Sequence, residues 1–258
     1  MIQQHNYVIS LKKANERREH IQIEFGKQNI PFEFFDAITP DDLDEQSKKL
    51  GISISESILT RGEIACAMSH LSVIHKAKAE NLDYVCIFED DVYLGENIAD
   101  FLNDKYVNND VSIVKIEHNI PKLNVSLFPE KVYKARKFYR LKGINMGCGG
   151  YIVTKKGIDF ITKNIKAIKD VEIDNLLFRD LLKEKDYLVW QMWPAICIQD
   201  CILYPENYSL GIMENRDEER SKRTKRIRKT LFVKIGREIS RNIRRMRWHL
   251  LDKRSYFK

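Results

Sequence analysis

The sequence predicts an α/β fold, and three features support this. An apolar segment rich in β-branched and aromatic residues, 5–11, is followed by a helix-like segment and a second strand at 32–35. The most pronounced apolar run, 84–88, follows a segment with helical spacing, and a further buried strand is expected at 111–116. Strands that alternate with helices are typical of a sheet joined by helical crossovers, so we expect a mostly parallel central sheet.

The first two helices have recognisable limits. The helix after residue 15 should bury Ile21 and Phe25, and Pro31 should end it because proline cannot continue a helix. The second helix begins at a capping box, in which the side chains of Thr60 and Glu63 each reach the other residue's amide. Its apolar residues follow at helical spacing: Ile64, Met68, Leu71 and Ile74.

The second half of the chain continues the α/β pattern. Four glycines lie within 143–150, and β character resumes at 151–153. Helices are expected at 155–165 and 173–182, and a strand at 188–193. The character of the sequence changes near residue 215, which predicts a domain over residues 1–215 and a separate tail over 216–258.

Charge divides at the same point. Of the net charge of +7, residues 216–258 carry +12 and residues 1–215 carry −5. Between the basic residues, apolar ones recur at helical spacing: Leu231, Ile235, Ile239, Ile243, Met246 and Leu250. A basic amphipathic helix of this kind binds at the interface of an anionic membrane. Packing on the domain or on a partner subunit is the alternative.

Several features bear on the compartment. No apolar run approaches the roughly 20 residues that span a bilayer, and the first residues lead directly into a strand without a signal peptide. The five cysteines are odd in number and lie mostly among apolar neighbours, which favours free thiols in a reducing cytosol. Cys197 and Cys201 have no matching second pair, so no structural zinc site is expected.

Three consecutive carboxylates, Glu89, Asp90 and Asp91, follow the strand at 84–88. In open α/β sheets, ligands bind outside the carboxyl ends of the strands. Adjacent carboxylates repel one another unless a cation or a donor compensates them. Mg²⁺ and Mn²⁺ take carboxylate oxygens and often bridge to phosphates. The cluster is therefore a candidate metal site, and a solvated acidic turn is the alternative.

The segment 59–91, LTRGEIACAMSHLSVIHKAKAENLDYVCIFEDD, resembles the signature of glycosyltransferase family 25, the lipooligosaccharide-biosynthesis family. The opening VISLKKANERR is similar to that family's first strand and basic pair, GYIV at 150–153 resembles its Gly-Tyr-Ile-Ile motif, and IDNLL at 173–177 resembles its Asp-His-Leu-Leu segment. Asn175 departs from the pattern, where His is expected, which weakens a metal or proton-transfer role at that position. The resemblance covers roughly residues 5–205.

The resemblance implies a GT-A-type nucleotide-sugar-binding fold. It also implies inverting transfer of a hexose, galactose from UDP-galactose, onto a lipooligosaccharide or lipopolysaccharide core; UDP-glucose is the alternative donor. Asp91 would bind Mn²⁺ or Mg²⁺, Asp90 would bind or orient the same ion, and Glu89 would contact the ribose or support the site. The protein would be cytoplasmic and peripheral, acting on a glycolipid at the cytoplasmic face of the inner membrane.

An inverting transfer needs a base that takes the proton of the acceptor hydroxyl. Asp174 is the first candidate, because it opens a predicted helix within a family-like motif, although Asp also favours helix starts as a cap. Glu117, just after the strand at 111–116, is the second. It could instead accept a hydrogen bond from a sugar hydroxyl or lie at the surface.

Further residues are candidates for binding the donor. Arg17 follows the first strand, and a guanidinium can pair with a phosphate, although a solvated helix residue is the alternative. Ser69 and His70 form the family's Ser-His pair, yet a histidine on such a helix is commonly structural.

Glycines and polar residues near the end of the resemblance complete the candidate set. Gly149 and Gly150 would let the backbone approach the sugar closely, or would form a tight turn. Gln199 is a candidate polar contact. Trp190 and Trp193 are better explained by core packing than by stacking on an acceptor sugar.

Two other classes of function fit the sequence less well. A nucleic-acid-binding protein would use the basic tail, but the acidic body has no recognisable nucleic-acid motif and the tail's apolar stripe would be unexplained; we therefore expect no nucleic acid as partner. A non-catalytic adaptor at a membrane is the other alternative, and the intact carboxylate triplet argues against it.

Overall fold

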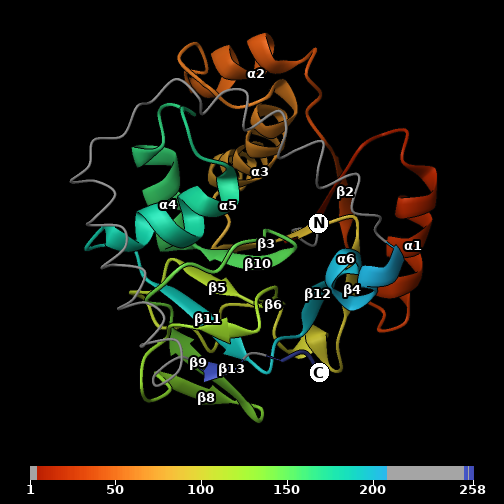
Figure 1. Ribbon diagram of the computed structural model, residues 1–258, viewed down its shortest axis with the longest axis vertical. Coiled ribbons are helices and arrows are strands. Elements are labelled where there is room, and N and C mark those ends of the chain that lie inside the picture. Colours follow the sequence, from red (N-terminus) through yellow and green to blue (C-terminus); the bar gives the residue numbers. More distant parts are fainter. Residues whose placement is uncertain (1–4, 208–252, 255) are drawn as a thin grey trace.

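The computed structural model describes residues 5–207, 253–254 and 256–258 (Figure 1). An eight-stranded sheet forms the centre of this part of the molecule. In their order across the sheet, the strands are β2 (Glu33–Asp36), β1 (Asn6–Ser10), β3 (Tyr84–Glu89), β10 (Gly150–Thr154), β5 (Ile113–Lys115), β11 (Val189–Trp193), β9 (Arg136–Arg140) and β8 (Lys131–Tyr133). The predicted α/β class is confirmed.

The sheet is mixed, so the prediction of a mostly parallel sheet was wrong. β1 pairs in parallel with β2 and β3, and β5 with β11. β10 runs antiparallel to both β3 and β5, and β9 runs antiparallel to β11 and β8. The physical reason lies in the glycine-rich loop 143–149, which precedes β10 at the edge where β3 ends. A strand that starts there has to run back in the opposite direction.

Helices cover both faces of the sheet (Figure 1). One face carries α2 (Leu43–Leu50), α3 (Arg61–Ala79), α4 (Lys155–Asn164) and α5 (Ile173–Asn175), and the other carries α1 (Asn15–Gly26). Successive residues of β3 alternate between the two cores: Val85 and Ile87 pack with the α3 side, Cys86 and Phe88 with the α1 side. Burying one aliphatic or aromatic side chain of this kind stabilises the fold by about 1.5–3 kcal/mol.

Helix α3 begins at the predicted capping box. Thr60 Oγ1 accepts the Glu63 N–H at 3.1 Å, and Glu63 Oε2 accepts the Thr60 N–H at 2.8 Å. The pair satisfies two donors that a helix start leaves without intrahelical partners. The predicted apolar face of α3 is buried, and the helix is thereby fixed with His70 against the end of β3.

A second, three-stranded sheet joins segments that are far apart in the chain. It consists of β4 (Val92–Leu94), β12 (Cys197–Gln199) and β6 (Glu117–His118), with β12 in the middle. Gln199 lies opposite Val92, the residue after Asp91, and Cys197 lies opposite Glu117. The pairing therefore brings the acidic residues that follow β3 and β5 toward one another, and α6 (Asp200–Leu203) continues from β12.

The segment 173–182, expected to be one helix, is broken. After α5 come a π-helical turn at Leu176–Asp180 and a 3₁₀ turn at Leu181–Lys183. Phe178 has non-helical backbone angles (φ −114°, ψ 16°). Its buried ring packs edge-on against Tyr151 with centroids 5.7 Å apart, and the Lys115 ammonium lies 4.2 Å from the ring centroid. This packing accounts for the interruption.

The predicted boundary at residues 215 and 216 and the predicted amphipathic helix at 231–250 lie outside the described residues. The described C-terminal residues contact the body: β13 (Lys253–Arg254) pairs with β7 (Lys122–Leu123), and Phe257 forms a bridge with Ala195. Within the described part of the chain, every helix is too short or too polar to cross a membrane.

Candidate functional site

The acidic triplet lies at the carboxyl edge of the main sheet, as its position after a buried strand predicted. Glu89 is the last residue of β3 and pairs with Ile9 near the end of β1. Gly150, the first residue of the antiparallel β10, pairs with Phe88 at the same edge. The ends of β1 and β3 and the start of β10 therefore meet at this edge.

Glu89 is held from two sides. His70 Nε2 lies 3.2 Å from Glu89 Oε1, and Gln199 Nε2 donates to Glu89 Oε2 at 2.7 Å. The other ring nitrogen of His70 lies 2.9 Å from the Tyr151 hydroxyl. Burial of His70 would lower its pKa, but hydrogen bonds and charge from Cys66 and Glu89 raise it to about 10. These two partners thus favour the protonated imidazole against the effect of burial, and the ring orients Glu89.

Asp91 and Glu89 share one hydrogen-bond donor. Gln199 Nε2 is 3.2 Å from Asp91 Oδ1, besides its bond to Glu89. Burial and the charge of Glu89 raise the pKa of Asp91 to about 6, although the bond from Gln199 lowers it. A cation relieves this kind of repulsion, and a set of carboxylate oxygens suits Mn²⁺ or Mg²⁺. The residues present therefore fit a hard divalent ion.

Asp90 is paired with the arginine predicted to contact the donor. Arg17 Nη1 donates to Asp90 Oδ1 at 2.9 Å; the aspartate side chain is 11% exposed and the arginine side chain 55%. The structure thus brings both candidates to the same edge of the sheet, where they form an ion pair with each other. Arg18 instead bonds to the Ser10 carbonyl and to Asp36, away from the triplet.

Glu117 is fully buried, which excludes the surface position that the sequence left open. Its carboxylate lies 3.3 Å from the ammonium of Lys115, and neither carboxylate oxygen has a hydrogen-bond partner among the described residues. Burial raises the pKa of Glu117 to about 7, although Lys115 lowers it.

Lys115, the last residue of β5, holds the glycine-rich loop in place through its ammonium group. Its fully buried ammonium donates to three consecutive carbonyls, those of Asn145, Met146 and Gly147, at 2.7, 2.6 and 2.7 Å. Buried charges persist when they are paired and hydrogen-bonded. Lys115 thus fixes the loop's path above Glu117.

Asp174 fixes the same loop from the other side. Its Oδ2 accepts the Gly147 N–H at 3.1 Å, and its Oδ1 accepts the Asn175 N–H at 2.6 Å. Gly147 has a φ of +88°, and a Cβ there would lie 2.7 Å from Glu117 Oε1. Only glycine meets both conditions, and it lies between the two predicted base candidates.

Gly149 and Gly150 allow the main sheet to pack closely on β12. A Cβ on Gly149 would lie 2.7 Å from Gln199 Cγ, and one on Gly150 would lie 2.6 Å from Cys197 Sγ. The two glycines were predicted to let the backbone approach a sugar closely; the close approach that the structure shows is between their backbone and β12. The same packing places Gln199, the candidate polar contact, between Glu89 and Asp91.

Ser69 and the tryptophans lie apart from the carboxylates. The buried Ser69 hydroxyl accepts the Ile38 N–H at 2.8 Å and donates to the Ala65 carbonyl at 2.8 Å, so its bonds are made within the protein. Trp190 is 1% exposed and belongs to the core, as expected. Trp193 packs against Tyr139 and Tyr256.

Two residues of this region were not selected from the sequence. Lys115 carries no local signal, because a lysine inside an apolar strand gives no hint of the carbonyls that it meets. Cys66 precedes His70 by four residues on a predicted helix, a spacing that places both on one face; that signal could have found it.

The sequence profile of glycosyltransferase family 25 (LPS biosynthesis protein) matches residues 3–177. A Haemophilus influenzae protein assigned as a glycosyltransferase is 42% identical over 92% of this chain and 84% of its own length. The Haemophilus influenzae lipooligosaccharide biosynthesis protein lic2B is 35% identical over 93% and 94% of the two chains. The Neisseria gonorrhoeae lacto-N-neotetraose biosynthesis glycosyltransferase LgtE is 33% identical over 96% of each. The resemblance found in segment 59–91 is confirmed: the chain belongs to glycosyltransferase family 25.

Proposed function

We propose that this glycosyltransferase moves a hexose, with inversion, from a UDP-sugar to a lipooligosaccharide or lipopolysaccharide core. The observation that carries the proposal is the convergence of Glu89 and Asp91 on Gln199 at the carboxyl edge of the sheet. Nucleotide ligands bind at that edge in open α/β sheets. The names of the relatives lic2B and LgtE support an oligosaccharide of the cell surface as acceptor, and a GT-A-type arrangement fits the α/β layers.

Asp91 and Asp90 would hold a Mn²⁺ or Mg²⁺ ion. When bound, such an ion neutralises the charge that develops on a diphosphate leaving group. Asp90 can take part only if Arg17 turns away from it, because the two are paired at 2.9 Å. Arg17 is the more exposed partner, and in this proposal its guanidinium turns to a donor phosphate and leaves Asp90 for the metal.

Asp174 would be the base that accepts the acceptor's proton. It is partly exposed, whereas Glu117 is fully buried beneath the glycine loop, and a base has to reach the hydroxyl. Asp174 Oδ1 accepts both the backbone N–H and the side-chain amide of Asn175, whereas Oδ2 accepts only the Gly147 N–H and keeps a lone pair for the acceptor's proton. Glu117 is better placed to support the loop through its ion pair with Lys115.

The remaining donor contacts would come from groups around Glu89. Glu89 would accept a ribose hydroxyl, with His70 and Gln199 holding its orientation. Gly149 and Gly150 would shape the backbone beside the sugar. Ser69 would act indirectly, through its bond to the Ile38 amide.

The donor is identified by a screen of nucleotide sugars. UDP-galactose, UDP-glucose and a GDP-hexose control are tested for thermal stabilisation and for hydrolysis, with and without Mn²⁺. We expect stabilisation by the UDP-sugars only and Mn²⁺-dependent hydrolysis of UDP-galactose. Preference for UDP-glucose would select the alternative donor, and equal responses to UDP- and GDP-sugars would overturn the UDP assignment.

The basic C-terminal segment supports a location at the membrane. The segment 216–258 carries +12, and a basic residue near an anionic surface contributes about 1 kcal/mol of binding. We propose that the protein binds peripherally to the cytoplasmic face of the inner membrane, where a glycolipid acceptor would be presented.

A further inference from the structure

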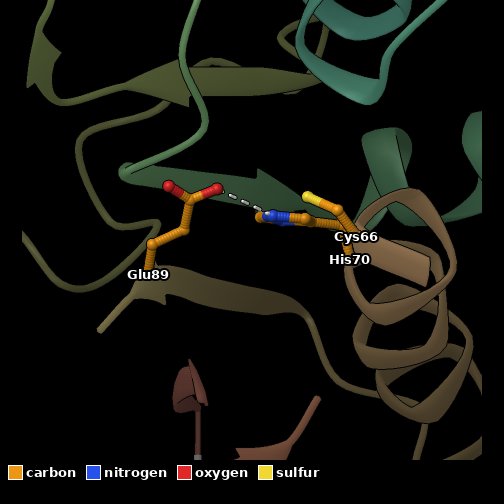
Figure 2. A group of neighbouring side chains, drawn as sticks. All are labelled: Cys66, His70 and Glu89. Carbon is orange, nitrogen blue, oxygen red and sulfur yellow. Dashed lines mark hydrogen bonds and ion pairs between the residues drawn. The ribbon is translucent and has the colours of Figure 1, made fainter. Parts of the chain in front are cut away.

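Cys66, His70 and Glu89 form a cluster of three different metal-binding side chains (Figure 2). One donor atom from each lies within 4.8 Å of the other two. Cys66 and His70 are one turn apart on α3, and Glu89 ends β3. Figure 2 shows the sulfur and the imidazole projecting side by side from the helix toward the carboxylate.

The spacing of the three groups suits zinc. Zinc binds nitrogen, oxygen and sulfur at 2.0–2.3 Å in tetrahedral geometry, so its ligand atoms lie roughly 3.3–3.8 Å apart. His70 Nε2 and Glu89 Oε1 are already 3.2 Å apart. The sulfur has to move by no more than about 1–1.5 Å, within the reach of a side-chain rotation of the exposed Cys66.

Neighbouring groups hold two of the ligands in place. Tyr151 lies 2.9 Å from Nδ1 of His70, which leaves Nε2 directed at the cluster. Gln199 donates to Oε2 of Glu89 and leaves Oε1 facing His70. Partners of this kind fix the orientation of metal ligands and raise affinity. His70 is 1% exposed, whereas the exposed Cys66 opens a path for the ion.

We propose that Cys66, His70 and Glu89 bind Zn²⁺, with water in the fourth position. On binding, the ion displaces to water both the thiol proton of Cys66 and the proton held between His70 and Glu89. A thiolate and an imidazole prefer zinc to Mg²⁺ or Mn²⁺, which favour oxygen ligands alone. The protein would therefore distinguish two classes of ion at adjacent places: a hard ion at Asp90 and Asp91, and zinc at this cluster.

Zinc at the cluster should inhibit sugar transfer. The bound zinc would hold the carboxylate of Glu89. Because Gln199 donates to both Glu89 and Asp91, a shift of Glu89 would also displace Asp91 from the position that we propose for sugar transfer. This consequence rests on the proposed function, whereas zinc binding itself does not.

The test uses Co²⁺ as a spectroscopic substitute for zinc in the metal-free full-length protein. Thiolate ligation gives a sulfur-to-cobalt charge-transfer band in the near ultraviolet. We expect the wild type to show this band, Zn²⁺ to abolish it, and Cys66→Ser to lack it with a zinc affinity at least about tenfold weaker. Cys201→Ser, which removes another partly exposed thiol outside the cluster, should keep the band.

Any other spectroscopic outcome contradicts the proposal that Cys66, His70 and Glu89 bind zinc. No band in the folded wild type means that the cluster does not bind the ion, and a band that persists in Cys66→Ser or disappears in Cys201→Ser places the thiolate elsewhere. Circular dichroism confirms folding. In the activity assay, micromolar Zn²⁺ should inhibit Mn²⁺-supported transfer by the wild type but not by Cys66→Ser. Absence of any transfer would count against the proposed function alone, because the spectra are read without substrate.

Discussion

Asp174 and Glu117 lie on either side of Gly147, and they differ in exposure rather than in chemistry. If Asp174 is the base, Asp174→Asn slows transfer by about 10²-fold or more, because a general base contributes on that scale. UDP affinity, measured by calorimetry, should stay near the wild-type value. Glu117→Gln should slow transfer less. Weak UDP binding with only a modest loss of turnover in Asp174→Asn would reassign this residue to organising the loop.

The burial of Glu117 makes a separate prediction about stability. Its pKa of about 7 in the folded protein exceeds the ordinary value of 4.5, so the folded state holds the proton more tightly than the unfolded state. The stability that this gives is complete below the unfolded pKa and is lost as pH rises through about 7. Glu117→Gln lacks this loss, so its stability relative to wild type should increase between pH 5 and pH 8, by up to about 3 kcal/mol.

Urea unfolding at the two pH values measures this difference. Glu56→Gln is a suitable control, because the Glu56 side chain is 75% exposed beside Lys169 and its removal should change stability little at either pH. A difference between Glu117→Gln and wild type that is the same at both pH values would show that Glu117 titrates normally.

At the scale of elements, the glycine loop depends on one lysine. Lys115→Met removes three hydrogen bonds to carbonyls of the glycine loop and leaves Glu117 without its cation. Breaking a buried ion pair by removing one partner costs about 3–5 kcal/mol, and we expect a loss of unfolding free energy of that size in urea. Lys78→Met, which removes a surface pair with Asp159, should cost less than about 1 kcal/mol. An equal loss of unfolding free energy in the two variants would contradict the role of Lys115 in holding the glycine loop.

Elements with a local signal were predictable from the sequence. The capping box at Thr60 and the alternation of β3 depend on neighbours in the chain, and both were observed as expected. The direction of β10 and the break at Phe178 depend on contacts with distant residues. Periodicity contains no information about such contacts, which is why the mostly parallel sheet and the single helix at 173–182 were predicted wrongly.

The residues of the candidate site likewise fall into two groups, those with a local sequence signal and those whose contacts come from distant parts of the chain. Glu89, Asp90 and Asp91 were found from their place after a strand, and Arg17 from its place after another. The roles of Gln199 and Lys115 depend on β12 and on the glycine loop, which return from residues far along the chain. Only the folded arrangement could show that one amide serves both Glu89 and Asp91.

At the scale of the whole molecule, the charge division predicts membrane binding by the segment that contains Leu231 and Leu250. The protein should sediment with vesicles that contain anionic lipid and be released by high salt, because exposed charges are screened beyond about 8 Å at physiological ionic strength. Ile239→Glu with Ile243→Glu should abolish binding, because it destroys the predicted apolar stripe while it lowers the net charge of residues 216–258 only from +12 to +10.

Point substitutions are preferable to truncation in this experiment. Deleting everything after Arg216 would also remove β13 and the bridge of Phe257 to Ala195, which belong to the folded body. Vesicle binding by the double variant at the wild-type level would rule out an interfacial helix. Precipitation of the double variant would place the stripe in a protein interface instead.

The central claim is that the carboxylates at the end of β3 support sugar transfer through a divalent ion. Asp91→Asn tests it most directly, because asparagine keeps the shape of the side chain and removes its charge. Turnover of UDP-galactose is measured at saturating Mn²⁺, together with the melting temperature. We expect transfer to be abolished while the melting temperature stays at or above the wild-type value, since burial already disfavours the charged form of Asp91. Near-normal turnover in the folded variant would contradict the claim.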